Sequence, residues 1–402
     1  MQALLRLVLA WLGGCTVAAA AAAQPAAAAP AQHLLVVQAD PPQATLVDAD
    51  RLRPVGSVAL PRVTLGAPRF SPDGRYAWFG ARDGWISRVD LRALRIAGEA
   101  RVGDALASFA LSSDGRWLLA GNETPPTLVL LDAELNLVKT FAAATADGKR
   151  TSRVGTVTDA APRTSFVVAL RDIPEMWEIS YNPRAEDIYA GLVHDFRMGE
   201  GVPMRGFHNA RRSQLVEPLV NLFFDDAHTH VVGSSEAEPA TAQVVNLDVR
   251  RRIATLALRG RPVLASGLAF GWQGTQALAV PNAELGALDV IDMRNWKLAL
   301  SVPRPGPGAW LAGRAAGQPR WWADAAAGAA WTAFDKATLA PGATLQLPAP
   351  AVAPLTFTAD GRRLLACTSG LVLAYDAATL APAGRLALAS PITDCALVPA
   401  PR

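Results

Sequence analysis

The sequence predicts an all-β fold, an eight-bladed β-propeller, from three observations. An Asp-Gly hairpin turn recurs, apolar strands end in Asp at a nearly constant interval, and the chain length fits eight such intervals. The chain has 402 residues, 51% of them hydrophobic, which suffices for one large domain or for two or three ordinary ones. Its 32 Gly and 30 Pro follow no collagen period and favour many short elements separated by turns.

The first repeated feature is a turn of the type Phe-Ser-Pro-Asp-Gly-Arg. It occurs at 70–75, and related turns occur at 111–116 and 357–362. Each turn is followed by an apolar run, as expected of a β-hairpin with Asp-Gly at its tip.

The second repeated feature is an apolar strand that ends in Asp before a turn and a Leu. The Asp residues concerned are Asp48, Asp90, Asp132, Asp248, Asp292, Asp335 and Asp376. Steps in the unbroken series are 42, 42, 44, 43 and 41 residues, and the 116 residues between the third and fourth Asp fit one further unit, ending near Ser180, plus an insertion. A unit of this length with four short strands is typical of a propeller blade.

The chain length and the two chain ends predict eight blades. The 370 residues from His33 to Arg402 allow about 46 for each of eight blades, near the observed step, whereas the alternative of seven blades needs about 53. A lone apolar strand, Thr393 to Val398, follows the last complete unit. We therefore expect the N- and C-terminal strands to complete one blade together, which removes exposed sheet edges.

The N-terminal segment is similar to a bacterial lipoprotein signal. A short apolar run after Arg6 leads into Leu-Gly-Gly-Cys at 12–15. We expect a signal peptide at 1–14, a lipid on Cys15, an Ala-rich tether at 15–32 and the propeller at 33–402. An ordinary cleaved signal peptide is the alternative. Thr16 stands where Asp would favour the inner membrane, so the expected location is the periplasm, lipid-anchored to the outer membrane.

The remaining cysteines and the overall charge exclude several classes of protein. Cys367 and Cys395 lie in apolar strand-like segments, so two separate buried thiols are the favoured interpretation, with a disulfide as the alternative. No Cys-x-x-Cys-His occurs, which excludes covalent c-type haem, and no flavin or NAD signature is present. With 38 Lys+Arg against 35 Asp+Glu and no run of like charge, nucleic acid is not an expected partner.

Residues 171–225 depart from the repeat and contain most of the unusual side chains. We expect an insertion around 182–218, and a segment with four charges around a Pro precedes it at 171–178. Within the insertion, His194 lies next to Asp195, an arrangement suited to acid–base chemistry or to axial ligation of haem iron. His228 and His230 lie on a hairpin turn, where solvent exposure is the simpler interpretation.

Motifs in the same region resemble the NirF family of heme d1 biosynthesis proteins. They are HDFRMGEG at 194–201, Arg-Arg at 211–212, Glu-Pro-Leu at 217–219 and Phe-Phe-Asp at 223–225. More distantly, the chain resembles the heme d1 domain of cytochrome cd1 nitrite reductase, through blade motifs at 69–71, 74–76, 82–84, 89–91 and 174–175. The likeness covers 33–402, and the missing haem-attachment motif fits NirF better than a complete nitrite reductase.

The resemblance implies a periplasmic propeller that binds heme d1 or its dihydro precursor at the mouth of its channel. Such a ligand is a flat apolar macrocycle with several carboxylates, so its pocket requires apolar walls and arginine forks. The positions that match the family nominate for cofactor binding Arg69, Arg82, Arg153, His194 and Arg197, with His194 as the iron ligand.

Three functions remain open at this point, and carriage of the tetrapyrrole is favoured over catalysis. Leu65 and Val263 stand where the family has His, and a carboxylate clamp survives such a loss better than proton transfer does. In the enzymatic alternative, a tetrapyrrole side chain is modified while His194, Asp172 and Glu175 move protons. A scaffold for protein–protein assembly is a third possibility. Expected partners are the heme d1 precursor, nitrite reductase, a late-step dehydrogenase and the membrane, and a homodimer stays open.

Overall fold

The computed structural model describes residues 32–189, 203–303, 311–313, 320–324 and 328–400. The chain divides into two units, Met1–Pro30 and Ala31–Arg402. All described residues belong to the second unit, so the predicted signal peptide, Cys15 and most of the tether lie outside them.

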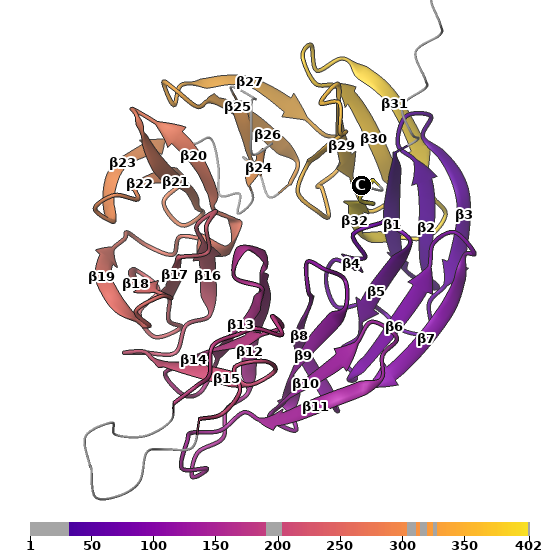
Figure 1. The fold of residues 1–402 in the computed structure, drawn as a ribbon. Helices are drawn as coiled ribbons and strands as arrows, with labels where there is room; N and C mark the ends of the chain where they lie inside the picture. Colours follow the sequence, from indigo (N-terminus) through magenta and orange to yellow (C-terminus); the bar gives the residue numbers. More distant parts are fainter. Residues whose placement is uncertain (1–31, 190–202, 304–310, 314–319, 325–327, 401–402) are drawn as a thin grey trace, which may run out of the picture. The chain divides into compact units, whose positions relative to one another are not determined.

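The second unit contains eight four-stranded antiparallel sheets, which confirms the predicted eight-bladed propeller (Figure 1). Blade 1 combines both ends of the chain and consists of β32 (Ile392–Leu397), β1 (His33–Ala39), β2 (Pro42–Asp48) and β3 (Arg53–Ala59). Blade 2 consists of β4 (Arg69–Phe70), β5 (Tyr76–Gly80), β6 (Trp85–Asp90) and β7 (Arg95–Arg101). Blade 3 consists of β8 (Ala105–Leu111), β9 (Trp117–Thr124), β10 (Thr127–Asp132) and β11 (Leu137–Ala142).

The next three blades follow the same order, from the innermost to the outermost strand. Blade 4 consists of β12 (Val154–Ala160), β13 (Ser165–Leu170), β14 (Glu175–Ser180) and β15 (Ala210–Gln214). Blade 5 consists of β16 (Asn221–Phe224), β17 (His230–Ser234), β18 (Thr241–Asn246) and β19 (Arg251–Ala257). Blade 6 consists of β20 (Leu268–Trp272), β21 (Thr275–Asn282), β22 (Ala287–Asp292) and β23 (Lys297–Pro303).

Two further blades lead back to the first. Blade 7 consists of β24 (Leu311–Gly313), β25 (Arg320–Asp324), β26 (Ala330–Asp335) and β27 (Pro341–Gln346). Blade 8 consists of β28 (Thr356–Phe357), β29 (Arg363–Cys367), β30 (Leu371–Asp376) and β31 (Pro382–Ala387). The helices of the described residues are two 3₁₀ turns, η1 (Ala161–Arg163) and η2 (Leu264–Ser266), and none is long and apolar enough to cross a bilayer.

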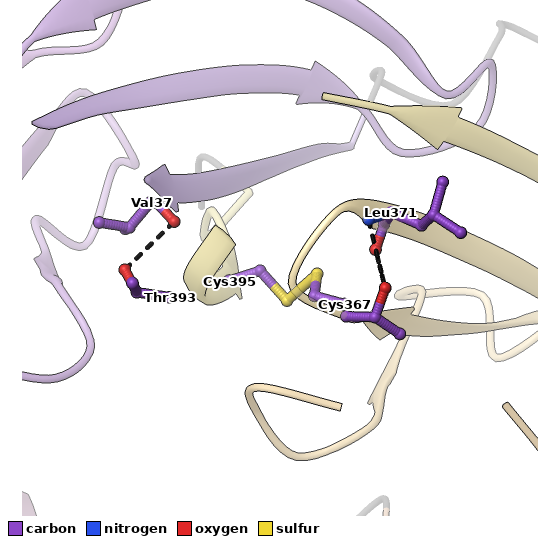
Figure 2. The surroundings of a disulfide bond; sticks show 6 residues. Val37, Cys367, Leu371, Thr393 and Cys395 are labelled. Atoms are coloured by element: carbon purple, nitrogen blue, oxygen red, sulfur yellow. Dashed lines mark hydrogen bonds between the residues drawn. A yellow bond between two sulfur atoms is a disulfide. The ribbon is translucent and has the colours of Figure 1, made fainter. Parts of the chain in front are cut away.

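The ring closes through blade 1, as the lone C-terminal strand predicted. β32 pairs antiparallel with β1 in a register that places Val36 opposite Cys395, and Thr393 donates to the carbonyl of Val37 (3.3 Å; Figure 2). Both edges of β1 are therefore paired, and β32 supplies the innermost strand that the N-terminal part of this blade lacks.

A disulfide links Cys367 of β29 to Cys395 of β32, which differs from the favoured expectation of two separate buried thiols (Figure 2). The two residues are 28 positions apart in neighbouring blades and face each other across the junction of blades 8 and 1, with their Cα atoms 6.5 Å apart. The prediction failed because packing between blades, not the strand pattern, sets this distance. The bond connects the closing strand covalently to the blade beside it.

Hydrogen bonds explain both repeated sequence features. In the Asp-Gly turn of blade 2, Ser71 donates to Asp73 (2.6 Å), the N–H of Tyr76 donates to Ser71 (2.9 Å), and Gly74 has φ of +65°. In the other repeated turn, Asp48 accepts from the N–H groups of Asp50 and Arg51 at 2.9 and 2.8 Å. These local bonds fix the hairpins from which each blade is built.

The hydrophobic core lies between neighbouring blades. One cluster, between blades 3 and 4, contains Leu119, Phe166 and Trp177. Another, between blades 8 and 1, contains Leu34 and Cys395. The fourth and outermost strand of each blade has an exposed face, and β3 and β19 share the same exposure pattern.

The extra residues of blade 4 lie between its third and fourth strands. β14 ends at Ser180, where the period predicted the end of a unit, and β15 begins at Ala210. The strand β15 falls within the range 182–218 expected for the insertion, but it is the outermost strand of the blade. The antiparallel order places this connection at the end of the propeller where the innermost strands finish.

Candidate functional site

The strand order gives the propeller two distinct ends. At the interblade end, the innermost strands begin and the loops between blades lie. At the hairpin end, the innermost strands finish and the Asp-Gly turns lie. Contacts between successive blades support this assignment, because the N–H of Leu106 in β8 donates to the carbonyl of Arg82 in blade 2 (3.1 Å).

Arg69 is the first residue of the two-residue strand β4, the innermost strand of blade 2, and lies opposite Trp78 in the middle of β5. Its guanidinium lies 5.4 Å from the ring centroid of Phe109 in blade 3 and donates to the carbonyl of Ala67 (3.1 Å). Burial lowers the pKa of Arg69, and the charge of Asp394 on β32 partly offsets this effect. Within the described part of the chain Arg69 forms no ion pair within 4 Å, so a partly desolvated cation is available to an external anion.

Arg82 follows β5 in the loop to β6 and is exposed at the interblade end of the same blade. Only its backbone carbonyl takes part in a hydrogen bond among the described residues. Arg69 and Arg82 thus belong to the same blade, Arg69 on its innermost strand and Arg82 in the loop after β5, and a shared binding role for them stays a prediction.

Arg153 and Asp172 are held together at the interblade end of blade 4. The Nε and Nη2 atoms of Arg153 donate to the two carboxylate oxygens at 3.0 and 2.6 Å, and the Arg153 N–H adds a third bond of 2.8 Å. These bonds lower the pKa of Asp172, mainly through the Arg153 side chain, and keep the carboxylate ionised.

Glu175 is the first residue of β14 and is 3% exposed. It accepts hydrogen bonds from Trp177 (2.9 Å), Gln214 (3.0 Å) and Arg212 (3.4 Å). Arg212 in turn lies 4.3 Å from the Trp177 ring centroid and donates to the carbonyl of Ala144. This carboxylate therefore anchors β15 to β14 in a closed hydrogen-bond network.

Two predicted site residues lie outside the described residues, and two positions where His was expected hold apolar residues. His194 and Arg197 lie outside the described residues. Leu65, where the resemblance led us to expect His, packs against the core between blades 2 and 3, and Val263 immediately precedes η2. The innermost strands carry no His in the described part of the chain, and no group of three or more His, Cys, Asp or Glu could hold a metal there.

Sequence analysis missed an ionic network centred on Arg171, directly before Asp172. Its Nη2 lies 2.7 Å from Glu236 of blade 5, and its Nη1 lies 3.4 Å from Glu123 of blade 3. The Nε atom is buried without a hydrogen-bond partner among the described residues. An alignment of the blades in the sequence could have found this network, because the three residues occupy the same position of the repeat in successive blades.

The histidines also differ from their expected surroundings. His230 is partly buried and bonded to Asp225 (2.9 Å), whereas the turn predicted solvent exposure. His208 stacks on Phe207 with 3.7 Å between ring centroids, and burial together with the Lys139 charge lowers its pKa to about 4. At physiological pH His208 is therefore neutral and secures the end of the insertion against blade 3.

The hairpin end carries a partly buried carboxylate that no sequence motif indicated. Asp159, near the end of β12, accepts a hydrogen bond from the hydroxyl of Tyr181 (2.8 Å), which also lies 2.9 Å from Ser113 of blade 3. Burial raises the pKa of Asp159 to about 6. The cluster joins blades 3 and 4 where the insertion begins.

The arrangement at the interblade end suits recognition of a carboxylated, flat and apolar molecule. A half-buried arginine beside a phenylalanine offers a charged fork and an apolar wall, and Arg82 adds a second exposed cation. Both cations are suited to bind carboxylates, whereas His194, the predicted iron ligand, lies outside the described residues.

Comparison with known proteins identifies the family and several relatives of the chain. The family described as the cytochrome D1 heme domain matches residues 29–394. A protein named dihydro-heme d1 dehydrogenase, from Pseudomonas aeruginosa, is 34% identical over 344 residues, which are 84% of this chain and 64% of that protein. A protein named NirF, from Stutzerimonas stutzeri, is 36% identical over 115 residues, 28% of this chain and 29% of that protein. The chain thus spans less than two thirds of the length of these curated relatives.

A solved structure extends the likeness to the fold. The structure titled dihydro-heme d1 dehydrogenase NirN in complex with DHE superposes with a TM-score of 0.80 at 33% identity, covering 94% of this chain and 78% of that chain. The family match covers most of the chain, and the eight-bladed fold agrees with the solved structure. The chain therefore belongs to the cytochrome D1 heme domain family and is related to proteins of heme d1 biosynthesis.

Proposed function

We propose that this chain binds heme d1 or dihydro-heme d1 at the interblade end of its channel and carries it during maturation of a heme d1 enzyme. The observation that supports this most is Arg69, a partly buried guanidinium against Phe109 with one hydrogen bond to the described chain. A bound carboxylate would form a direct ion pair with it, in addition to the attraction of Asp394. Arg82, on the same blade, would bind a second carboxylate of the ligand.

The surroundings of Asp172 and Glu175, the two candidates for proton transfer that the structure describes, favour carriage over catalysis. Asp172 is committed to Arg153 through three hydrogen bonds, and its pKa is lowered, which makes it a weak general base. Glu175 is buried and accepts three side-chain hydrogen bonds, so it has little freedom to face a ligand.

A dehydrogenase acting on dihydro-heme d1 is the second candidate function. It is favoured by the 34% identity over 84% of this chain to a protein of that name. When bound, the tetrapyrrole itself would carry the redox chemistry, and the protein would bind and orient it. The finer assignment to NirF, which the motifs at 194–225 suggest, belongs with the carrier proposal.

The cellular setting completes the proposal. Periplasmic location, lipid attachment at Cys15 and anchoring to the outer membrane follow from the N-terminal sequence. Nitrite reductase and a late-step dehydrogenase are the proposed protein partners.

An absorption titration tests both functions. The purified full-length chain is mixed with heme d1 and, separately, with dihydro-heme d1 together with an added electron acceptor. A spectral shift without conversion supports the carrier, and conversion of the dihydro compound supports the dehydrogenase. Absence of any shift with both ligands refutes the two tetrapyrrole functions together.

The role of Arg69 is tested in the same titration. Loss of a charge-assisted pair predicts that Arg69→Gln weakens binding by roughly 10- to 100-fold. The matched control is Arg101→Gln, since Arg101 is exposed on the outermost strand of the same blade and pairs with Asp104. Equal affinities of the two variants would contradict the assignment of Arg69.

A further inference from the structure

Four charged residues occupy equivalent positions in four successive blades at the interblade end. Each lies six residues after the first residue of the second strand of its blade, and they are Arg82, Glu123, Arg171 and Glu236. The charges alternate in sign around this arc. The same position holds Ala39 in blade 1 and Ser369 in blade 8, so the charged arc covers one side of the ring.

The two arginines of the arc differ in their partners. Arg171 lies between both glutamates, 2.7 Å from Glu236 and 3.4 Å from Glu123. Arg82 is exposed and forms no ion pair within the described part of the chain. The arc therefore has a neutralised cation in blade 4 and an available cation in blade 2.

A hollow next to Arg171 could admit a ligand carboxylate, so it matters that Arg171 is already paired and Arg82 is not. It has a volume of about 400 Å³ and is lined by Arg171, Glu217, Val220 and Glu236, among others. The side chains of Glu123 and Glu236 are 39% and 62% exposed, so both negative charges are accessible from outside. A carboxylate that approached Arg171 would have to displace one glutamate and remain beside it.

We propose that Glu123 and Glu236 orient the ligand: they occupy Arg171 and thereby direct the carboxylates of a bound tetrapyrrole toward Arg69 and Arg82 in blade 2. This inference rests on the proposed function. The glutamates act as specificity-determining residues through Arg171, and the opposite edge of the macrocycle then faces blades 4 and 5. Repulsion between a ligand carboxylate and Glu236 adds to the effect, because like charges at close range disfavour that orientation.

Neutralising one glutamate tests the proposal. In Glu236→Gln, Arg171 becomes partly available and the repulsion falls, so heme d1 should bind about two- to fivefold more tightly, the range expected for one exposed charge pair. The methyl ester of heme d1 lacks the carboxylate charges, so its affinity should not change. Glu134→Gln is the matched control, because Glu134 is 64% exposed at the opposite end of blade 3.

A double-mutant cycle with Arg82→Gln measures the orientation itself. In the wild type, Arg82→Gln should weaken binding of heme d1 by roughly three- to tenfold. In the Glu236→Gln background the loss should be at least halved, because the ligand can use Arg171 instead. Melting curves of all variants confirm that folding is unchanged.

The outcomes separate this inference from the proposed function. If the wild type binds heme d1 but Glu236→Gln binds it no more tightly and the loss from Arg82→Gln is the same in both backgrounds, the orienting role is refuted while the binding function stands. A gain of affinity for the ester equal to that for heme d1 also refutes it. If the wild type binds neither heme d1 nor dihydro-heme d1, both proposals fall.

Discussion

The disulfide across the ring closure should contribute measurably to stability. Cys367 and Cys395 are 28 residues apart, and closing a loop of that length in the unfolded chain corresponds to about 3.6 kcal/mol at 25 °C in the chain-entropy model. A unit of the size of residues 33–402 has an unfolding entropy of roughly 0.8 kcal/mol per kelvin. Reduction should therefore lower the melting temperature by about 4–5 °C.

Thermal unfolding followed by circular dichroism, with and without reductant, measures this difference. Mass spectrometry of the alkylated protein verifies the redox state of both cysteines, and the variant Cys367→Ala/Cys395→Ala should melt near the reduced wild type and be insensitive to reductant. Free thiols in the untreated protein, or equal melting temperatures of the oxidised and reduced forms, would refute the reasoning.

Three further predictions concern charge and backbone. Because burial raises the folded-state pKa of Asp159 to about 6, the folded state binds more protons than the unfolded state between pH 4 and 6. The unfolding free energy should therefore rise as the pH falls through that window, by about 1–2 kcal/mol after allowance for solvent screening. Denaturant titrations of Asp159→Asn should lack this rise. Glu175→Gln removes the charge from a buried network and should lower the unfolding free energy by about 1–3 kcal/mol in urea titrations. Ligand affinity should be unchanged if the role of Glu175 is structural. A selective loss of conversion in a stable variant would instead indicate catalysis. Gly84→Ala should destabilise the protein by about 2–4 kcal/mol, because φ is +84° and a Cβ would lie 2.0 Å from the carbonyl oxygen of Gly103. The control Gly148→Ala should cost about 1 kcal/mol, because φ is +68° there but the space is open. Equal melting temperatures of the two variants would contradict the close approach.

The repeat made the fold predictable. Turns such as 70–75 are stabilised by bonds within six residues, so their sequence specifies them. Asp48, Asp90, Asp335 and Asp376 end the third strands of their blades and accept from N–H groups two and three positions later. In blade 5 this role belongs to Asn246, so the expected strand end at Asp248 was two residues too late. Ring closure followed from the lone strand at the C-terminus. In each case the determining interaction is local or repeats at a fixed interval.

The candidate site was predictable only in part, because its contacts cross between blades. The pairing of Arg171 with Glu236 joins residues 65 positions apart, and the disulfide depends on the packing of blade 8 against blade 1. Motifs located Arg69 and Arg82 but gave no information on which arginines already have partners. Aligning the blades by position would have found the charged arc from the sequence.

A crystal structure of the full-length chain with dihydro-heme d1 bound tests the central claim most directly. The account predicts the macrocycle at the interblade end, with a ligand carboxylate within about 3.2 Å of the Arg69 guanidinium and the carboxylate-bearing edge toward blade 2. A ligand bound at the hairpin end, or one whose carboxylates contact neither Arg69 nor Arg82, would contradict it.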